Sequence, residues 1–583
     1  MLNIKNIYKT KTDYLKKIVK SFSLTEKTIF IILSILLVIS SLSLLGKVNS
    51  YFTTTVPAHG GSLTEGVIGS PRFINPLLEL SEADRDLTYL VYSGLMRATA
   101  NGDLIPDLAE SYIISPDGLT YTFKIKDNAY FHDGKKVTAD DIEFTVQMAQ
   151  DINLRSPKRN SWVGVDVEKI NEKEIIFKLK QPYSPFLENT TLGILPKHIW
   201  SNATTDEFSF SSFNIEPIGS GPYLVNKIKR NGSGIPAYYE LTAFNKYTLG
   251  EPYITNLTFN FYSNEKALTD AYQSGAIDST NSISPQNLDA MRNKNYGVTE
   301  KISLPRVFGV FFNQNQAKIF LNKEVRQALN MTVDKDRVVS EVLNGYGKKI
   351  DGPLPVGASS KNSVNEATYN KDEAIKQAKE ILSKAGWKFN EESKVWEKKI
   401  SKTETQKLAF SISTSNTSDL KETAEILKED WTLLGAQVEI QVIDVGDLNQ
   451  TISQRKYDSL LFGETIGRSL DLFAFWHSSQ RNIGNNMAMY TNIKADALLE
   501  QARQISDKTE RLKKYALFEK EILNDIPAIF IYSPEFIYLL PSKIKGFKSG
   551  LINNRAERFE EVYRWYIETD KIWNFLTPKL KAN

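Results

Sequence analysis

The pattern of hydrophobic and polar positions changes after the first sixty residues of the chain. Residues 28–46, "TIFIILSILLVISSLSLLG", are uncharged and mostly apolar, and they lie between Lys27 and Lys47. A helix rises about 1.5 Å per residue, so this run reaches about 29 Å, close to the hydrocarbon thickness of a bilayer. The pattern predicts one transmembrane helix, followed by a polar linker at 47–60.

A cleaved secretory signal is the alternative interpretation of this run. The apolar region of a signal is shorter, about 7–15 residues, and ends at a small-residue cleavage site. The following residues, "GKVNSYFTTT", contain no convincing site of that kind, which favours an uncleaved anchor. Seven lysines and only two acidic residues precede the run in 1–27. The lysine excess predicts a cytoplasmic tail at 1–27 and an extracytoplasmic main domain, periplasmic or at the cell surface.

The rest of the chain alternates between helical and strand-like patterns. Residues 420–434 carry apolar residues at steps of four and three, which is one face of a helix, and Gly435 suits its C-terminal cap. The next residues alternate between apolar and polar up to Val442, as in a half-buried strand. The same interleaving along the chain predicts a mixed α/β (α+β) architecture. The apolar residues of this unit are Leu420, Ala424, Leu427, Trp431, Leu434, Val438, Ile440 and Val442.

One of the four histidines lies in "YTFKIKDNAYFHDGKKVT", residues 121–138. The first residues alternate like a strand, Asp133–Gly134 is a tight-turn signal, and Thr138 is a good N-cap for the next helix. A metal site would need further ligands nearby, and the other histidines are far away in sequence. We therefore expect His132 to be structural.

Composition excludes several classes of function. The net charge is +3, and the excess is confined to the N-terminal tail, which argues against nucleic acid as the main partner. The absence of cysteine excludes disulfides, thiolate metal sites and a lipid-modified cysteine. Neither a serine-hydrolase elbow nor a zinc-protease motif occurs. We expect no enzyme, no cofactor and no metal, although a surface peptidase remains the alternative from another class.

Several ordered motifs resemble the family 5 extracellular solute-binding proteins, which include the oligopeptide- and dipeptide-binding components of ABC importers. The resemblance covers about residues 61–548 and departs from the family in lacking a lipidated cysteine. The stretches that carry it are "IPDLAESYIISPDGLTYTFKIKDNAYFHDGKKVTADDIEFTVQMAQD", "GGSLTEGVIGSPRFINPL", "VYSGLMRATANGDLIPDLA", "PIGSGPYLVNKI", "NKEVRQALNMTVDKDRVVSEVLNGYG" and "YNKDEAIKQAKEILSKAGW".

The resemblance implies a bilobal, periplasmic-binding-protein-like fold with an inserted sub-lobe. Lobe I would comprise 61–110, 215–303 and 532–583, the sub-lobe 111–214, and lobe II 304–531. Two crossings between the lobes would form a hinge that closes on the ligand.

The implied function is a membrane-anchored, monomeric receptor that delivers peptides to an ABC permease. A cleft between lobes can bury an extended ligand and hold its backbone by hydrogen bonds. An oligosaccharide or another solute is the alternative ligand within the same fold. A nickel complex is disfavoured by the few histidines.

Site residues follow from the resemblance alone. In peptide-binding relatives, the loop after the "YDSLLFG"-type strand carries an aspartate for the ligand's α-amine, whereas here Arg468 follows Gly467. Glu464 or Asp471 could take the amine and Arg468 a carboxylate, or Arg468 and Asp471 could simply pair with each other. The candidate cleft residues are Asn75, Tyr92, Arg306, Asn313, Glu464, Arg468, Asp471, Trp476 and Asn486.

Overall fold

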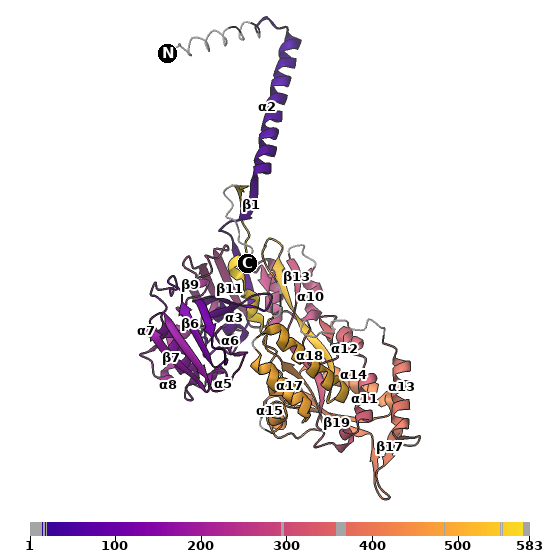
Figure 1. Cartoon of the computed structure of the whole chain (residues 1–583). Helices are drawn as coiled ribbons and strands as arrows, with labels where there is room; N and C mark the ends of the chain where they lie inside the picture. The colour runs from indigo at the N-terminus through magenta and orange to yellow at the C-terminus, as the bar shows by residue number, and fades with distance from the viewer. Residues whose placement is uncertain are drawn as a thin grey trace. The chain divides into compact units, whose positions relative to one another are not determined.

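The structure is a computed structural model (Figure 1). It describes residues 14, 18, 20–292, 297–356, 369–482, 484–505, 507–548, 550 and 552–574. The chain divides into two compact units, Met1–His59 with Glu568–Asn583, and Gly60–Ile567.

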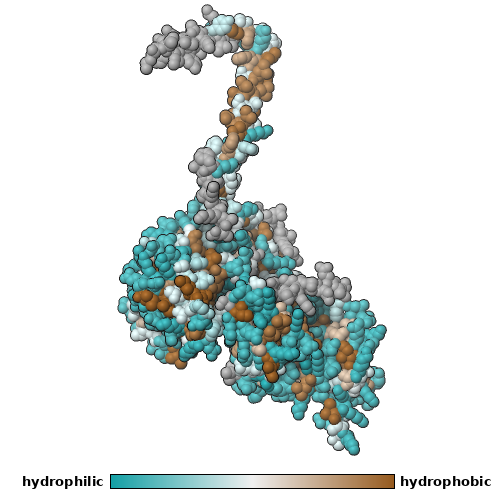
Figure 2. All heavy atoms as spheres, viewed as in Figure 1, coloured by the Kyte–Doolittle hydropathy of each residue, from teal (hydrophilic) through white to brown (hydrophobic). Residues whose placement is uncertain are grey.

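The smaller unit contains the apolar helix. Helix α2 (Leu24–Phe52) begins at a capping box between Ser23 and Glu26, and its hydrophobic residues are the brown band in Figure 2. Its portion Leu24–Asn49 is long and apolar enough to cross a membrane, and none of it is buried by the protein.

The expected linker is not a linker in this structure. Helix α2 continues to Phe52 and leads directly into strand β1 (Thr53–Pro57), which pairs antiparallel with β23 (Thr569–Trp573). The segment is ordered because its backbone groups are satisfied by these partners. Residues from Glu568 onward therefore group with the smaller unit, whereas the family resemblance placed them in lobe I.

The larger unit is built on a 12-stranded mixed sheet. Strands β13 (Gly297–Ser303) and β15 (Gly347–Lys349) pair with β22 off the main path. The main path runs β20 (Gln437–Ile443), β19 (Ala409–Ser415), β21 (Ser459–Thr465), β14 (Arg306–Phe312), β22 (Ala528–Pro541), β12 (Ser279–Thr280), β2 (Ser62–Ile68), β11 (Asn256–Tyr262), β10 (Pro236–Ala243) and β9 (Tyr223–Arg230).

Strand β22 is shared by two parts of this sheet. Its residues 528–532 pair with β14, and its residues 535–541 pair with β13. We call β2 and β9–β13 the first sheet half, and β14, β15 and β19–β21 the second sheet half. The chain passes between the halves at Leu304–Pro305 and again along β22.

A smaller antiparallel sheet packs into the core of the first half. Its order is β5-β6-β8-β7, and the buried aromatic rings of Tyr121 and Phe123 on β6 belong to the same hydrophobic core as the first sheet half. The strands are β5 (Ala109–Ile114), β6 (Thr120–Ile125), β7 (Val165–Asn171) and β8 (Glu174–Leu179). Short strands elsewhere are β3 (Met96–Ala98), β4 (Leu104–Pro106), β16 (Lys388–Asn390), β17 (Val395–Lys399) and β18 (Thr405–Lys407).

The helices begin and end close to the predicted positions. Helix α14 (Ser418–Leu434) ends at Gly435, whose φ of 105° is left-handed, as a glycine cap allows. Thr138 and Asp141 form the predicted capping box of α4 (Ala139–Gln150). The other helices of the first half and the smaller sheet are α3 (Glu82–Val91), α5 (Arg159–Trp162), α6 (Phe186–Asn189), α7 (Lys197–Trp200), α8 (Thr205–Phe208), α9 (Glu265–Ser274), α10 (Pro285–Arg292), η1 (Ser212–Asn214), η4 (Arg555–Phe559) and η5 (Val562–Arg564). Those of the second half are α11 (Lys323–Met331), α12 (Lys335–Glu341), α13 (Lys371–Lys384), α15 (Val445–Ser453), α16 (Phe473–Trp476), α17 (Ile493–Gln504), α18 (Lys508–Asp525), η2 (Lys318–Leu321) and η3 (Ser478–Gln480).

His132 is structural, as predicted. Its Nδ1 accepts a hydrogen bond from the Gly219 N–H at 3.3 Å, and its Nε2 lies 3.1 Å from the Gly221 carbonyl oxygen. One ring thus joins the turn to the glycine-rich segment 219–221. Burial lowers the pKa of His132 from 6.5 to about 4, so the imidazole is neutral at pH 7.

Candidate ligand-binding site

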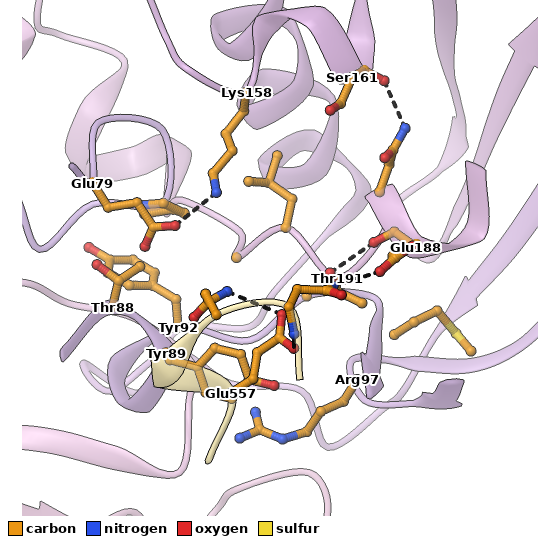
Figure 3. Close-up of a pocket in the computed structure, with 18 of the residues that line it drawn as sticks. Glu79, Thr88, Tyr89, Tyr92, Arg97, Lys158, Ser161, Glu188, Thr191 and Glu557 are labelled. Carbon is orange, nitrogen blue, oxygen red and sulfur yellow. Dashed lines mark hydrogen bonds and ion pairs between the residues drawn. The ribbon is translucent and has the colours of Figure 1, made fainter. Parts of the chain in front are cut away.

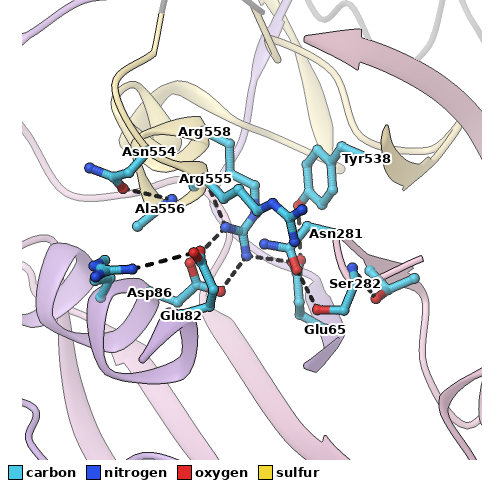
Figure 4. A network of polar contacts seen from close by, with 12 residues as sticks. Glu65, Glu82, Asp86, Asn281, Ser282, Tyr538, Asn554, Arg555, Ala556 and Arg558 are labelled. Carbon is cyan, nitrogen blue, oxygen red and sulfur yellow. Dashed lines mark hydrogen bonds and ion pairs between the residues drawn. The ribbon is translucent and has the colours of Figure 1, made fainter. Parts of the chain in front are cut away.

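The segment 553–560 is held in place by a buried arginine. The Arg558 guanidinium makes two hydrogen bonds of 2.7 Å to Asp86 on α3 and one of 2.7 Å to Glu65 on β2 (Figure 4). Glu65 also accepts hydrogen bonds from the Tyr538 hydroxyl, at 2.8 Å, and from the Ser279 hydroxyl, at 2.7 Å. Elements α3, β2, β12 and β22 therefore fix η4 in one position, and residues of η4 line two pockets.

The first pocket lies beside α3 and contains about 1080 Å³ of empty space, counting the part that opens to solvent. Figure 3 shows Glu79 and Lys158, which form an ion pair of 2.8 Å, on the same side as Thr88 and Tyr92. The lining comes from 76–97, 107, 158–162, 188–193 and 553–557. All of it belongs to the first half and the smaller sheet.

Two hydroxyls of the first pocket have no partner within the described residues. The Thr88 Oγ1 and the Tyr92 OH are buried without a hydrogen bond, and both residues line the pocket. A buried hydroxyl without a partner costs free energy, and a polar ligand in this pocket would satisfy both groups. Tyr92, one of the candidate cleft residues, lines this pocket, and its contact with a ligand stays a prediction.

The loop after β21 contacts the edge of this pocket. Arg468 donates hydrogen bonds to Glu557, at 2.8 Å, and to Glu560. The backbone N–H of Ser469 donates to Glu188 at 3.1 Å, and Asn553 donates to the other oxygen of Glu188 at 2.7 Å. The second sheet half is therefore joined to the first pocket through an arginine and a backbone amide.

Arg468 and Asp471 do not pair with each other, so that alternative is wrong. Leu470 between them has a φ of 58° and its N–H bonds to the Gly467 carbonyl, which turns the loop tightly and separates the two side chains. Asp471 instead binds Arg503 at 2.6 Å and accepts a hydrogen bond of 3.3 Å from the Tyr183 hydroxyl.

The second pocket lies between the two sheet halves and contains about 1070 Å³. Arg306 and Arg555 line it, and neither guanidinium forms an ion pair with any described residue. Burial and the neighbouring Arg555 lower the pKa of Arg306. The Arg306 Nε and the Asn281 amide nitrogen are buried donors without partners in the described part of the chain. Asp419 and Glu422 line the α14 side of the same pocket.

The remaining predicted residues are packed into the protein, and their contact with ligand stays a prediction. Glu464 is 2% exposed and lies in the second half, and burial raises its pKa well above the usual range. Burial disfavours the charged form of this carboxyl, which makes it a weaker partner for an ammonium group. Trp476 belongs to a hydrophobic core. The side chains of three asparagines bond within the protein: Asn75 to Asn214 and the Leu77 N–H, Asn313 to the Arg455 carbonyl, and Asn486 to the Tyr490 backbone.

Sequence reasoning missed Glu188, Arg555 and Glu557. Glu188 lies on the four-residue helix α6, which is too short to leave a periodic signal. Arg555 and Glu557 lie beyond residue 548, where the family resemblance ends. No group of three or more His, Asp or Glu side chains within the described residues could hold a metal ion.

Comparisons with known proteins agree with this architecture. The oligopeptide-binding protein AppA of Bacillus subtilis (strain 168) is 29% identical over 502 residues, which cover 84% of this chain and 90% of that protein. The solved structure of AppA from B. subtilis with a nonapeptide aligns with a TM-score of 0.65 at 27% identity, covering 88% of this chain and all of that one. NikZ of Campylobacter jejuni with Ni(L-His) aligns with a TM-score of 0.65 at 28% identity, covering 87% and 99%.

These likenesses confirm the predicted mixed α/β fold of the periplasmic binding proteins. They also confirm that the chain is a binding protein and not an enzyme, because the relatives that it matches belong to a family of substrate-binding proteins. The sequence model of the bacterial extracellular solute-binding proteins, family 5 (middle region), matches residues 103–486. The chain therefore belongs to the family 5 extracellular solute-binding proteins.

Proposed function

We propose that this chain captures peptides in the space between the two sheet halves and delivers them to an ABC import permease. The lobes would be those expected from the sequence, except that lobe I would end at 567 and not at 583: 61–110 with 215–303 and 532–567, and 304–531, with 111–214 as the sub-lobe. The relative with a bound nonapeptide supports a peptide as the ligand class. The larger unit, Gly60–Ile567, is called the binding unit from here on. It would act as a monomer that closes on its ligand.

The observation that carries this proposal is the placement of three charged side chains in the two pockets that η4 borders, Glu188 in the first pocket and Arg306 and Arg555 in the second. Glu188 and Glu557 line the first pocket, and Glu188 forms no ion pair with any described cation. Arg306 and Arg555 line the second pocket without an ion pair in the described residues. An extended peptide has an ammonium group at one end and a carboxylate at the other. We propose that Glu188 binds the ammonium group and that the two arginines bind the carboxylate.

This assignment differs from the one that the family resemblance suggests. Arg468 stands where peptide-binding relatives carry the aspartate for the α-amine, and it is already bound by Glu557 and Glu560. The negative charge for the amine then has to come from the opposite wall of the pocket. Glu188 is the carboxylate that the loop contacts there, through Ser469.

Titration calorimetry on the full chain in detergent tests both ends separately. The ligands are a mixed nonapeptide pool and the same pool with acetylated N-termini or amidated C-termini. We expect Glu188→Gln to weaken binding of the free peptides by about 10- to 100-fold, and acetylation to cause no further loss in that variant. Arg306→Gln and Arg555→Gln should show the same pattern with amidation. Asp471→Asn serves as the comparison variant and should keep the preference for a free N-terminus.

Other results would redirect the proposal. If Asp471→Asn removes the preference for a free amine and Glu188→Gln does not, the loop acid binds the amine. An oligosaccharide that binds while no peptide does would change the ligand class. Recovery of cleaved peptide would indicate the surface peptidase.

We also propose that α2 anchors the chain, with residues 1–27 in the cytoplasm and the binding unit outside. The length of the apolar helix supports a single crossing. Protease added to spheroplasts should digest the binding unit and spare the tail. A soluble protein that begins near residue 50 would show instead that the helix is a cleaved signal.

A further inference from the structure

The β1·β23 pair follows the apolar helix without an intervening loop, and it is not accounted for by ligand binding. Helix α2 ends at Phe52 and β1 begins at Thr53. The register pairs Thr53 with Trp573, and five residue pairs join the two strands. Each strand leads directly to the binding unit, β1 through residues 58–59 and β23 through Glu568. Both ends of that unit are thus connected to the end of the helix.

Three aromatic side chains gather at this point. The Phe52 and Trp573 rings stack with centroids 6.4 Å apart, and the Tyr51 ring contacts Phe52 edge-on at 5.2 Å. The exposed fractions are 78% for Tyr51, 48% for Phe52 and 45% for Trp573. Asn574 strengthens the cluster because it donates to the Tyr51 carbonyl at 3.3 Å and accepts from the Thr54 hydroxyl at 2.5 Å. An exposed aromatic cluster of this kind is unusual in water.

The position along the helix indicates what covers these rings. The candidate span Leu24–Asn49 has 26 residues, whereas about 20 helical residues cross the hydrocarbon core. The remaining turns lie in the headgroup layers, and Tyr51 and Phe52 follow Asn49 within one further turn. Tyr and Trp side chains prefer this layer because the ring is apolar and its polar group can remain hydrated.

The strand pair also needs an additional source of stability. A sheet of two short strands is marginal in water, and no third strand pairs with β1 or β23 in the described residues. Anchoring Trp573 and Phe52 in a lipid interface would stabilise the pair where the protein itself provides no core.

We propose that Tyr51, Phe52 and Trp573 lie in the outer headgroup layer of the membrane, and that β23 is a second attachment of the binding unit to that layer. The partner is the lipid interface, because the cluster continues directly from the membrane-spanning helix. The proposal rests on the anchor that we propose for α2. It adds that a strand more than 500 residues away in sequence contributes its own lipid contact.

Tryptophan fluorescence can test this contact selectively. Of the eight tryptophans, the seven others are at most 6% exposed, so lipid can reach Trp573 alone. The full chain is reconstituted into phosphatidylcholine vesicles that carry bromine either near the glycerol backbone or near the ends of the acyl chains. The signal is the emission of the wild type minus that of W573F. We expect the shallow bromine to quench this difference more strongly than the deep bromine, and aqueous iodide to quench it weakly.

Two variants connect the contact to the strand pair. Ile572→Pro places proline inside β23 and should release Trp573 from the lipid, which raises its quenching by iodide. The control is Ile493→Ser, at an 85% exposed position of the binding unit. This substitution should leave the lipid quenching unchanged. The vesicles contain no other protein, so quenching by bromine reports lipid and not a permease.

The outcomes separate this inference from the anchor. Strong iodide quenching and no bromine quenching, in a chain that floats with the vesicles, would overturn the lipid contact and leave the anchor intact. A chain that does not float with the vesicles would overturn the anchor itself. Bromine quenching that persists in Ile572→Pro would show that Trp573 contacts lipid without the strand pair, and would overturn the proposed role of β23.

Discussion

Two arginines of the binding unit are each held by two carboxylates, but they connect different parts of it. Arg558 binds Glu65 and Asp86 and joins elements of the first half only. Arg468 reaches from the second half to Glu557 and Glu560. Both side chains are largely buried, with 0% and 7% of their surface exposed. The chemistry is the same, whereas only the second contact has to break if the halves separate.

The two networks differ in when the cost of burying their charges arises. Burial raises the pKa of Asp86 to about 6 even beside Arg558, so for this carboxylate the cost of burial exceeds what the attraction of the arginine returns. The same burial, with Glu557 nearby, raises the pKa of Glu560 beside Arg468. In the first network the cost is fixed at folding. In the second it depends on whether the two halves are in contact.

The largest expected effect is the removal of Arg558. Arg558→Met leaves Glu65 and Asp86 buried without their cation, which should lower the free energy of unfolding by about 3–5 kcal/mol. Urea unfolding of the full chain in detergent measures this. The control is Arg564→Met, since Arg564 is half exposed and its one ion pair among the described residues is with Glu561 at i−3. A surface pair of this kind is worth about 1 kcal/mol or less. Equal losses in both variants would contradict the comparison.

The second largest expected effect is a pH dependence of stability caused by His132, whose contacts to 219–221 do not cross between the sheet halves. Its pKa is about 4 in the folded state against 6.5 ordinarily, so the unfolded chain binds a proton first as the pH falls. Stability is complete above pH 6.5 and should decline by at most about 3 kcal/mol as the pH falls to 4. His132→Gln should remove this share of the slope, and an unchanged slope in that variant would exclude the buried neutral ring.

A smaller effect on stability is expected for Arg468→Met. Burial already raises the pKa of Glu560 to about 9 beside Arg468, so this acid can stay protonated when the cation is lost, and the unfolding free energy should fall by only about 1–2 kcal/mol. The larger change should be in conformation. The chain has no cysteine, so spin labels can be placed at I113C and I400C, both exposed positions. They report the distance between the smaller sheet, which carries Ile113, and the second half, which carries Ile400. We expect a broader and longer distance distribution in Arg468→Met, and a distribution identical to wild type would show that the contact does not hold the halves together.

The smallest effect is a pH dependence of the same distance. The pKa of Glu560 is raised in the buried contact and should return toward 4.5 when the halves separate, so the closed form binds more protons. Closure should therefore increase as the pH falls from above the raised pKa toward 4.5. Glu560→Gln removes the titrating group and should flatten this dependence. A population of closed molecules that rises with pH instead would contradict the assignment.

Much of the fold could be predicted from local signals. The α14 helix with its cap at Gly435, the capping box at Thr138 and the structural role of His132 all depend on neighbours within a few residues. Periodicity and capping are local physics, and they leave readable patterns. The membrane-spanning length of α2 was readable for the same reason.

The site was only partly predictable. Tyr92 and Arg306, two of the candidate cleft residues that the family resemblance named, line the two pockets, and their contact with a ligand stays a prediction. The partner of Arg468 was not predictable, because Asp471 is close in sequence while Glu557 and Glu560 are close in space. A left-handed residue at Leu470 decides between the two arrangements.

The sequence alone determined the long apolar helix near the N-terminus, the alternation of helices and strands, and the family to which the chain belongs. Each of these can be predicted from local periodicity or from ordered motifs. The tertiary structure decided which charges meet: Arg558 with Glu65 and Asp86, Arg468 with Glu557 and Glu560, and β1 with a strand more than 500 residues away. Long-range pairing depends on how the chain folds back on itself, and a residue type carries no record of a partner so far along the chain.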